Sequence, residues 1–306
     1  MHRPVAVEID ADKCIGCGTC IDVCPSGTLS LVGGKATVSG NESLSCGHCE
    51  AACPVEAVRV STLINDSQHF KTFRQRLDWR APGTFDVADL VQLMRSRRSC
   101  RNYHDRPVPQ DVLQDLVKIG LTAPSGSNCQ PWTFTLVPSR AAVAQLGDLI
   151  AVFFRRLNRM SDRRLLRGAL KLIGKNELDF YYRNYREAVA QALEEWARTG
   201  RDILFHGAAA AILVGTRPGA ACPSEDALLA TQNILLGAHA MGLGTCLIGF
   251  AVSALKNDPA IAKRLGIPSE ESVHAVIALG YPDEVYQRLP GRKAAISRVW
   301  NPPPAG

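Results

Sequence analysis

The sequence predicts a two-domain protein with both helices and strands, and three observations lead to this prediction. The chain has 306 residues, which is enough for about two domains with separate cores. Seven of its 11 cysteines lie between Cys14 and Cys53. Residues 1–60 carry four Lys/Arg against seven Asp/Glu, whereas the whole chain has a net charge of +6. We therefore expect a small acidic, cysteine-rich domain at 1–62, a linker at 63–85 and a larger basic domain at 86–306.

The composition is that of a globular protein outside membranes. Apolar residues make up 46% of the chain and charged residues 21%. The longest apolar run, "ILFHGAAAAILVG", contains a histidine and is shorter than the roughly 18 residues of a membrane span. The first residues, "MHRPVAVEID", lack the basic and then apolar layout of a signal peptide. These features predict a cytoplasmic protein without membrane contact, whose cysteines are reduced rather than paired in disulfides.

A repeat with an offset of 29 residues runs through the first domain. "CIGCGTCIDVCPSGTLSL" (14–31) aligns with "SLSCGHCEAACPVEAVRV" (43–60). Cys17 falls on Cys46 and Cys24 on Cys53, and a short alternating strand is expected after each Cys-Pro pair. Two such units predict a pseudo-symmetric fold in which neither half has much core of its own.

The first copy has the spacing C-x2-C-x2-C-x3-C-P of bacterial iron–sulfur proteins. A zinc site usually pairs two separate C-x2-C units, and a c-type haem needs C-x-x-C-H, so both fit less well. In the iron–sulfur pattern the fourth cysteine of each run binds the other cluster. The predicted ligands are therefore Cys14, Cys17, Cys20 and Cys53 for the first cluster, and Cys24, Cys46, Cys49 and Ser43 for the second.

Ser43 stands where the second cluster needs a cysteine. A hydroxyl is a harder and much weaker acid than a thiol, so it binds iron less readily. Three outcomes stay open, namely an alkoxide ligand, a [4Fe-4S] cluster with one labile iron, and a [3Fe-4S] cluster. We favour four irons with a weakly held corner at Ser43.

The second domain begins with a predicted helix. Asp86 is a suitable N-cap, and Leu90, Leu93 and Met94 follow at helical spacing. The helix runs into "RSRRSCR", with four arginines in seven residues. Such a cluster is either a solvated face or an anion site. The turn-rich "LTAPSGSNCQPWTFTLV" and the paired cations of "LPGRKAAISRVW" favour a specific phosphate site.

Four of these segments carry a resemblance to a known family. "RRSCR", "APSGSNCQPW", "GLGTCLIGF" and "LPGRK" occur in the order and approximate spacing of the FMN-dependent nitroreductases, over about Asp86 to Trp300. With the ferredoxin-like repeat, the whole chain resembles the ferredoxin–nitroreductase fusions of bacteria. The resemblance implies an α+β fold that forms a homodimer with two FMN sites at its interface.

The resemblance also implies roles for residues of this chain. The FMN phosphate and ribityl chain would be held by Arg97, Arg98, Ser99, Arg101, Arg292 and Lys293. Planar guanidinium groups suit a phosphate dianion. The loop that lines the flavin of the neighbouring subunit would contribute Pro124, Ser125, Gly126 and Asn128, and the backbone beside the ring would come from Gly242, Leu243 and Gly244. No catalytic acid or base is assigned.

Residues 140–202 depart from the family pattern and predict a helical insertion. Residues 155–201 hold 12 Lys/Arg against six Asp/Glu. Two interpretations stay open: a solvated helical pair that covers the dimer, or a lid in which the rings of "DFYYRNY" (179–185) stack on a flat substrate. Nucleic-acid binding is not expected, because the cations are interleaved with acids. His206, Cys100, Cys129 and Cys246 are expected to be structural.

Together these motifs predict an oxidoreductase that relays electrons from a donor through iron–sulfur clusters to FMN. A small aromatic compound, nitro or quinone-like, is the expected acceptor. The expected donor is a ferredoxin-like protein or NAD(P)H. The alternatives are an electron-transfer or redox-sensing module without substrate turnover, and an ene reductase or reductive dehalogenase on the same scaffold.

Overall fold

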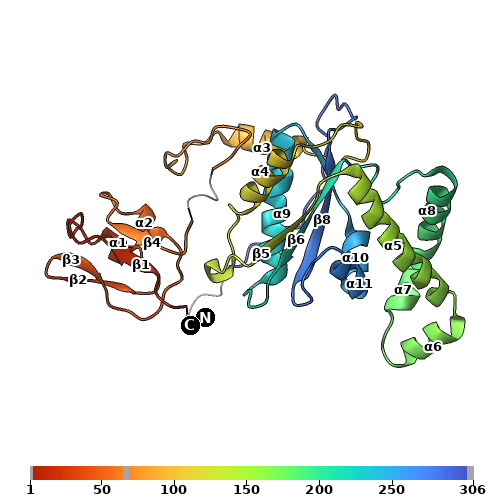
Figure 1. The fold of residues 1–306 in the computed structure, drawn as a ribbon, viewed down its shortest axis with the longest axis horizontal. Coiled ribbons are helices and arrows are strands. Elements are labelled where there is room, and N and C mark those ends of the chain that lie inside the picture. The colour runs from red at the N-terminus through yellow and green to blue at the C-terminus, as the bar shows by residue number, and fades with distance from the viewer. Residues whose placement is uncertain (1–2, 65–68, 302–306) are drawn as a thin grey trace.

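The computed structural model describes residues 3–64 and 69–301, which form a small N-terminal and a larger C-terminal domain (Figure 1). The described elements of the small domain are β1 (Val7–Ile9), α1 (Thr19–Asp22), β2 (Leu29–Val32), β3 (Lys35–Val38), α2 (His48–Ala51) and β4 (Val58–Val60). β1 pairs with β4 and β2 with β3, both antiparallel. α2 follows α1, and β4 follows β2, at the same offset of 29 residues as in the sequence. The two copies of the sequence repeat therefore form the same helix and strand, and a strand follows each Cys-Pro pair as predicted.

Both short helices of the small domain start at a left-handed glycine. Gly18 has φ 81° and Gly47 has φ 78°, a conformation that favours glycine. The helices carry Cys20 and Cys49 into a core whose buried members are Cys14, Cys20, Leu29, Ala36, Cys49, Ala57, Val58 and Val60. Because three of these eight residues are cysteines, bound clusters would supply much of the stability of the domain.

The larger domain is built on one antiparallel sheet. Its strands are β5 (Trp132–Val137), β6 (Ala210–Thr216), β7 (Gly244–Leu247) and β8 (Ser272–Gly280), in the spatial order β5-β6-β8-β7. Every residue of β6 is buried, because helices cover both faces of the sheet. This arrangement agrees with the predicted α+β class.

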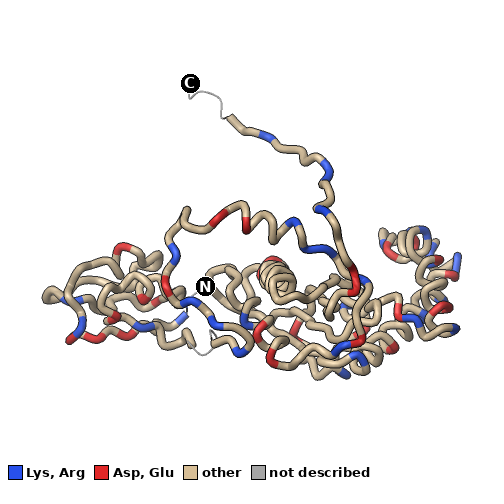
Figure 2. Tube along the Cα trace, turned by 90° about the horizontal axis from the view of Figure 1, so that it is seen from above, with Lys and Arg blue, Asp and Glu red and all other residues tan. Residues whose placement is uncertain are grey.

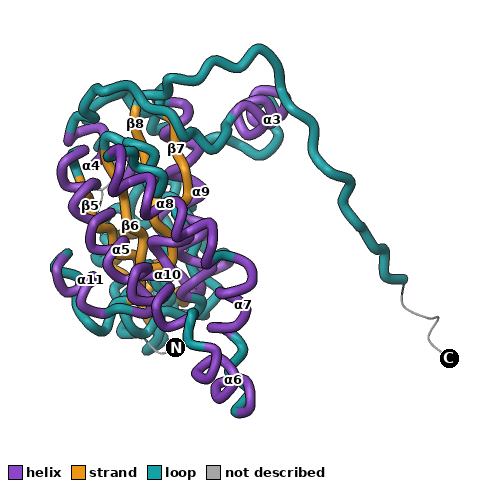
Figure 3. The backbone as a smooth tube through the Cα atoms, turned by 90° about the vertical axis from the view of Figure 1, so that its right-hand side faces the viewer, coloured by secondary structure: helices purple, strands orange, loops and turns teal. Residues whose placement is uncertain are grey.

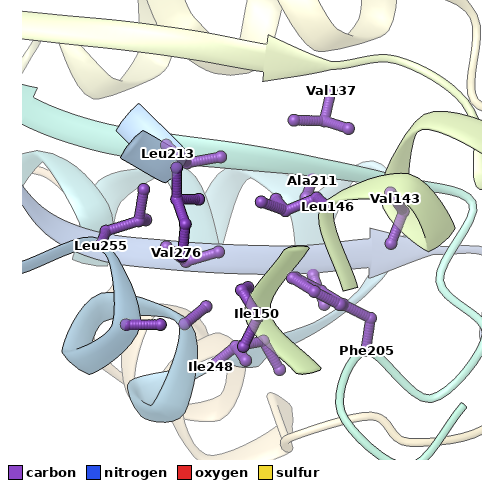
Figure 4. Packing of buried hydrophobic residues seen from close by; sticks show 14 of the residues in the cluster. Val137, Val143, Leu146, Ile150, Phe205, Ala211, Leu213, Ile248, Leu255 and Val276 are labelled. Atoms are coloured by element: carbon purple, nitrogen blue, oxygen red, sulfur yellow. The ribbon is translucent and has the colours of Figure 1, made fainter. Parts of the chain in front are cut away.

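One face of the sheet packs against α4 (Gln110–Gly120) and α9 (Pro223–Ala240), and the other against α5 (Arg140–Ser161), α10 (Gly249–Asn257) and α11 (Pro259–Arg264). In Figure 4, Leu146 and Ile150 of α5 and Leu255 of α10 pack with Leu213 and Val276 of the sheet. α9 has apolar residues on almost all sides, and seven of its 18 residues are buried, but Leu228 and Leu229 are exposed, so the predicted burial holds on one side of the helix only.

The 140–202 segment is helical throughout, but it is not the predicted pair of solvated helices. It forms α5 and three further helices, α6 (Arg164–Leu172), α7 (Glu177–Asn184) and α8 (Arg186–Thr199). α5 is part of the domain core, with buried residues at helical spacing that include Val143 and Ile150. Only α6 to α8 have the character of an insertion.

The aromatic rings of α7 pack within their own chain. Tyr181 stacks on Phe154, and Tyr185 meets Phe250 edge to face, with ring centroids 6.4 and 5.9 Å apart. Burial raises the pKa of Tyr181 to about 12, and its hydroxyl donates to the Asn158 side chain at 2.6 Å. In Figures 1 and 3, α6 and α7 lie at the end of the domain away from α3. The lid interpretation therefore finds no support within one chain.

α3 (Val87–Ser96) and the C-terminal arm (residues 281–301) stand apart from the layers (Figure 3). As predicted, the Asp86 side chain caps α3, accepting from the N–H groups of Ala88 and Asp89. α3 nevertheless buries none of its residues. On the arm, Ile296, Val299 and Trp300 are more than 80% exposed. Large apolar side chains at such exposure are unusual on a folded domain.

The linker is fastened to the larger domain by one buried carboxylate. Asp115 of α4 is fully buried and accepts hydrogen bonds from the N–H groups of Lys71 and Thr72 and from the Thr72 hydroxyl, at 2.6–3.1 Å. Burial opposes ionisation, but these hydrogen bonds outweigh it and hold the pKa of Asp115 below its usual value. No helix in the described part of the chain is long and apolar enough to cross a membrane.

We expect Asp115→Ala to lower the free energy of unfolding by about 1–3 kcal/mol, because it leaves buried N–H groups without an acceptor. Asp111→Ala removes only the exposed ion pair with the Lys71 amine and should cost less than about 1 kcal/mol. Because the pKa of Asp115 is depressed, its contribution is complete above about pH 4 and is lost as the pH falls through the folded value. Urea unfolding at pH values from about 2 to about 7, on both sides of the ordinary pKa of a carboxyl group, measures the free energy of unfolding of the wild type and of both variants. Equal losses for the two variants at pH 7 would contradict the assigned role.

Candidate functional site

The small domain brings the predicted thiols together in two sets. Burial raises the pKa of Cys20, and the adjacent thiols of Cys53, Cys14 and Cys17 raise it further. Cys53, from the second copy of the repeat, therefore lies with the three cysteines of the first copy. We call these four residues the first cluster site. The geometry matches the crossing pattern that the sequence predicts.

The second cluster site consists of Cys24, Ser43, Cys46 and Cys49, which line one small cavity. Burial raises the pKa of Cys49, and Cys24 and Cys46 raise it further. Ser43 is buried, and its Oγ accepts a hydrogen bond from the Ser45 N–H at 3.0 Å. Ser43 thus shares the cavity with the three predicted thiol ligands.

Backbone N–H groups point at the cysteine sulfurs in both copies of the repeat. Thr28 N–H donates to Cys24 Sγ at 3.4 Å, and Ala57 N–H, 29 residues later, donates to Cys53 Sγ at 3.2 Å. Such donors stabilise thiolates and tune the potential of a bound cluster. No three His, Cys, Asp or Glu side chains of the described residues converge on one point as ligands of a single ion. This finding is compatible with a [4Fe-4S] cluster, because in such a cluster each thiolate binds a different iron.

The larger domain gathers positive charge at the end of α3. Burial lowers the pKa of Arg97, and the nearby charges of Arg292 and Arg98 lower it further. Figure 2 shows Lys and Arg along the C-terminal arm, which starts beside other basic positions of the larger domain. Within residues 3–64 and 69–301, none of the three forms an ion pair with a carboxylate. With Ser99 and Arg101 we call this group the arginine site.

β7 places further polar groups beside the arginine site. Ser99 forms a parallel bridge with Thr245, and the Cys100 N–H donates to the Thr245 carbonyl at 2.9 Å. The Thr245 hydroxyl is buried and has no hydrogen-bond partner among the described residues. Buried hydroxyls are rarely left without one, so this atom is a candidate donor to a bound ligand. The loop that carries Lys293 is exposed on the arm.

Two glycines of the predicted ring-contacting segment are required for different reasons. Gly242 has φ 78°, which favours glycine. A Cβ on Gly244 would lie 2.7 Å from Cβ and Sγ of Cys100 and 3.1 Å from Pro282. The close approach at Gly244 is thus to the buried Cys100 of the same chain. Cys100 and Cys246 are buried as expected of structural thiols, and burial raises the pKa of Cys100 to about 11.

Gly244→Ala should therefore destabilise the protein by about 1–3 kcal/mol through overpacking, and should also disturb the turn at Ser99. Gly249→Ala is the matched control, because no atom lies within 4 Å of its added Cβ. We expect that change to stay within about 0.5 kcal/mol of the wild type. Urea unfolding measures both variants. A neutral Gly244→Ala would show that Cys100 moves aside.

The predicted loop at 124–130 is held by a residue that the sequence analysis did not single out. Asp226 of α9 is buried and accepts from the Gly126 N–H at 2.8 Å, while its carbonyl accepts from Trp132 Nε1 at 2.9 Å. Ser127, Asn128 and Gln130 have positive φ values of 53°, 51° and 45°. The only signal in the sequence is an acid in the first turn of an otherwise apolar helix.

Glu284 is a second residue that the sequence analysis missed. Its carboxylate accepts from the Arg101 N–H at 3.0 Å and from the Asn102 side chain at 2.9 Å. Burial opposes ionisation, but these bonds and that from Tyr286 hold the pKa of Glu284 below its usual value. Glu284 thus shapes the backbone of the arginine site.

His206, at φ 58°, is half-buried, and burial lowers its pKa.

The arginine site and loop 124–130 lie at opposite ends of β8. Ser99 bridges to Thr245 next to Gly280, the last residue of β8. Loop 124–130 leads into Trp132, which lies level with Ser272, the first residue of β8, across β6. The nine residues of β8 are joined by eight steps of about 3.4 Å, so these ends lie roughly 27 Å apart. One chain therefore does not bring both segments to the same ring.

Comparison with known proteins identifies the family of the chain. The sequence profile described as "Nitroreductase family" matches residues 94–281, more than half of the chain. The chain belongs to the nitroreductase family. A second profile, "4Fe-4S binding domain", matches residues 7–30, so this nitroreductase carries an N-terminal ferredoxin-like domain, as the motifs predicted. It is a flavin oxidoreductase of that family.

Several characterised proteins resemble this nitroreductase. An NADH dehydrogenase of Thermus thermophilus is 27% identical over 71% of this chain and 97% of its own length. A 4-nitrobenzoate reductase of a Nocardioides species is 28% identical over 62% and 79%. An iodotyrosine deiodinase of Thermotoga neapolitana is 23% identical over 68% and 96%. The solved nitroreductase of Bacteroides fragilis with bound FMN shares the fold, with a TM-score of 0.50 and 21% identity over 69% of this chain and 98% of that chain.

Proposed function

We propose that this nitroreductase binds FMN at the arginine site, receives electrons through two iron–sulfur clusters and reduces a small aromatic nitro or quinone-like compound. The observation that carries the proposal is the arginine site itself. Three clustered guanidinium groups without a carboxylate partner, next to the buried and unpartnered Thr245 hydroxyl, fit a phosphate-bearing cofactor. When bound, FMN supplies transfer of a hydride or of single electrons to the substrate.

The residues of the site bind and orient the cofactor and do no acid–base chemistry in this proposal. Arg97, Arg98, Arg101 and Arg292 would neutralise the phosphate, and Ser99 and Thr245 would offer hydroxyl donors beside it. Glu284 holds the Arg101 backbone in place. The solved Bacteroides fragilis relative, which contains FMN, has the same fold.

We infer that the functional unit is a homodimer. Because the arginine site and loop 124–130 lie roughly 27 Å apart, a flavin that touches both needs one of them from each chain. The exposed apolar residues of α3, the linker and the arm, including Trp79 and Trp300, supply a surface for a partner. Two-fold symmetry then gives two equivalent flavin sites.

The second cluster site fits a cluster with three thiolates and one weak corner. Its thiols converge with Ser43 on one cavity, and we propose four irons there with the fourth held loosely. We propose that the donor is a ferredoxin-like protein or NAD(P)H and that the protein is cytoplasmic, a compartment in which cysteines stay reduced. When bound, the clusters would supply transfer of single electrons.

A related activity, reductive dehalogenation, is the second candidate. It is favoured by the similarity to the Thermotoga neapolitana iodotyrosine deiodinase. A redox module without small-molecule turnover stays the third alternative, and no described feature favours it.

The test is anaerobic purification followed by flavin, iron, sulfide and light-scattering analysis. The flavin is then reduced and mixed with 4-nitrobenzoate, menadione or 3-iodotyrosine while its absorbance is followed. We expect a dimer with one FMN per chain whose reduced flavin is rapidly reoxidised by the nitro compound or the quinone. Selective reoxidation by 3-iodotyrosine would shift the assignment to dehalogenation. Reoxidation by none of the three would leave the redox module.

A further inference from the structure

We propose that the second cluster site is the exit of the relay, and that it delivers electrons to the flavin bound by the arginine site of the partner subunit. The inference rests on the proposed function. It is carried by the contact between the two domains, which involves the second cluster site and loop 124–130 and not the arginine site of the same chain.

The contact consists of direct hydrogen bonds between the cluster-binding loop and loop 124–130. The Asn128 side chain donates to the carbonyl of Ser45 at 2.8 Å. Arg3 donates to the carbonyls of Ser127 and Asn128, and its own carbonyl accepts from the Ser43 N–H. Ser45 stands between Ser43 and Cys46, two members of the second cluster site. Only one peptide unit therefore separates a cluster ligand from the residue that Asn128 contacts.

The backbone is strained on both sides of this contact. Six non-glycine residues of the described chain have positive φ, and four of them are Ser45, Ser127, Asn128 and Gln130. Such conformations persist only where the surrounding structure holds them, and they gather at functional sites. Away from the contact the domains are separated by an open cleft, whose lining includes Cys46, Gly47, Lys118 and Gln130. The ordered connection between the domains is thus concentrated at Asn128 and Arg3.

The first cluster site lies on the outer side of the small domain. Its Gly16 packs against the turn between β2 and β3, where an added Cβ would lie 2.0 Å from the Gly34 carbonyl. Figure 1 shows β2 and β3 at the edge of the small domain that faces away from the larger domain. Cys17 is exposed, which leaves this site open to an external donor. The order is therefore donor, first cluster site, second cluster site, flavin.

The opposite positions of the arginine site and loop 124–130 decide which flavin receives the electrons. A flavin held beside loop 124–130 would be bound by the arginines of the other chain, because those of its own chain lie at the far end of β8. The donor is a one-electron protein carrier such as a reduced ferredoxin. Two carriers each give up one electron, and these two electrons with one proton from solvent convert oxidised FMN to its reduced anion.

Mixed dimers test the direction of transfer. One chain carries Arg97→Ala and Arg101→Ala and keeps both cluster sites. The other carries Cys46→Ser and Cys49→Ser and keeps its arginines. Different affinity tags isolate the mixed dimer, which holds flavin only on the chain with a disrupted second cluster site. The measurement is single-turnover bleaching of flavin absorbance after mixing with reduced ferredoxin, with electron paramagnetic resonance of the clusters.

We expect the flavin of the mixed dimer to bleach at the wild-type rate. The Cys46→Ser/Cys49→Ser homodimer keeps FMN but lacks an intact relay, so its bleaching rate reports any direct reaction of the flavin with the carrier. This homodimer should bleach at least about tenfold more slowly than the wild type, which corresponds to a rise of about 1.4 kcal/mol in the barrier. Bleaching of the mixed dimer at that slow rate would show transfer within one chain and overturn the proposal. Absence of FMN from the wild type would instead defeat the proposed function.

The contact itself is tested with Arg3→Ala and the matched control Arg59→Ala. Both remove one positive charge from the small domain, but Arg59 lies exposed on β4 and makes no described contact with the larger domain. Arg3→Ala should slow flavin bleaching about tenfold while both cluster signals still form at the wild-type rate, because it removes two charge-assisted hydrogen bonds. Equal bleaching rates for the two variants would show that the contact does not carry the transfer.

Discussion

The Arg97→Ala/Arg101→Ala variant is expected to lose FMN almost completely, which is the largest effect that the structure predicts. Each guanidinium contact with a phosphate is worth about 1.5–3 kcal/mol, so losing two weakens binding by roughly two to four powers of ten. Arg97 is already crowded by Arg98 and Arg292. Because those charges remain, some affinity for phosphate persists, and excess FMN should partly restore occupancy.

The matched control is Arg155→Ala/Arg159→Ala on α5. These two arginines have the same spacing of four residues and are exposed, so the change in net charge is equal. The ratio of flavin absorbance to protein absorbance after gel filtration, followed by fluorescence titration with FMN, measures both variants. If the α5 pair loses as much flavin as the Arg97/Arg101 pair, general charge rather than a specific site holds the cofactor.

The Ser43→Cys variant is expected to retain the full iron content of its second cluster in air, whereas the wild type loses iron there. Ser43 lines the same cavity as Cys24, Cys46 and Cys49, and its hydroxyl accepts a hydrogen bond from the Ser45 N–H. A thiol in its place adds a soft, far more acidic ligand with little change in volume. The added thiolate should complete the cube without moving the loop.

Iron per chain and electron paramagnetic resonance, before and after brief exposure to air, test this expectation. The anaerobic wild type should hold about eight irons, and exposure should convert a fraction to a three-iron signal that Ser43→Cys lacks. Ser43→Ala is the control, since it removes the oxygen while keeping the three thiolates. An anaerobic wild type with only about four irons would show that the second site is empty. FMN content should be the same in all three proteins.

The sequence predicted best what depends on local spacing. The offset of 29 residues placed α1, α2 and both cysteine sets, because identical loops impose identical geometry. The Asp86 cap and the buried side of α9 followed from capping chemistry and apolar content. The four motifs also indicated the nitroreductase family, whose profile matches residues 94–281.

The sequence could not predict contacts that depend on how distant elements meet. The helical pattern of Arg140–Ser161 looked like an insertion, but burial of that face against the sheet makes α5 a core helix. Asp115, Asp226 and Glu284 each satisfy backbone N–H groups far away in the chain, and no local pattern distinguishes them from surface acids. The contact of Arg3 with loop 124–130 joins residues that are more than 120 positions apart.

The cysteine-rich core of the small domain makes metal supply a folding variable. Ligands that bind only the folded state raise its population by mass action, and here the ligand would replace protons on thiols that form part of the core. The larger domain has its own apolar clusters and contains none of the predicted metal ligands. In a cell short of iron, the chain would therefore keep a folded flavin domain while the small domain unravels. Such a protein would still react with small reductants but would be disconnected from carriers, so iron status would decide which reductant feeds the enzyme.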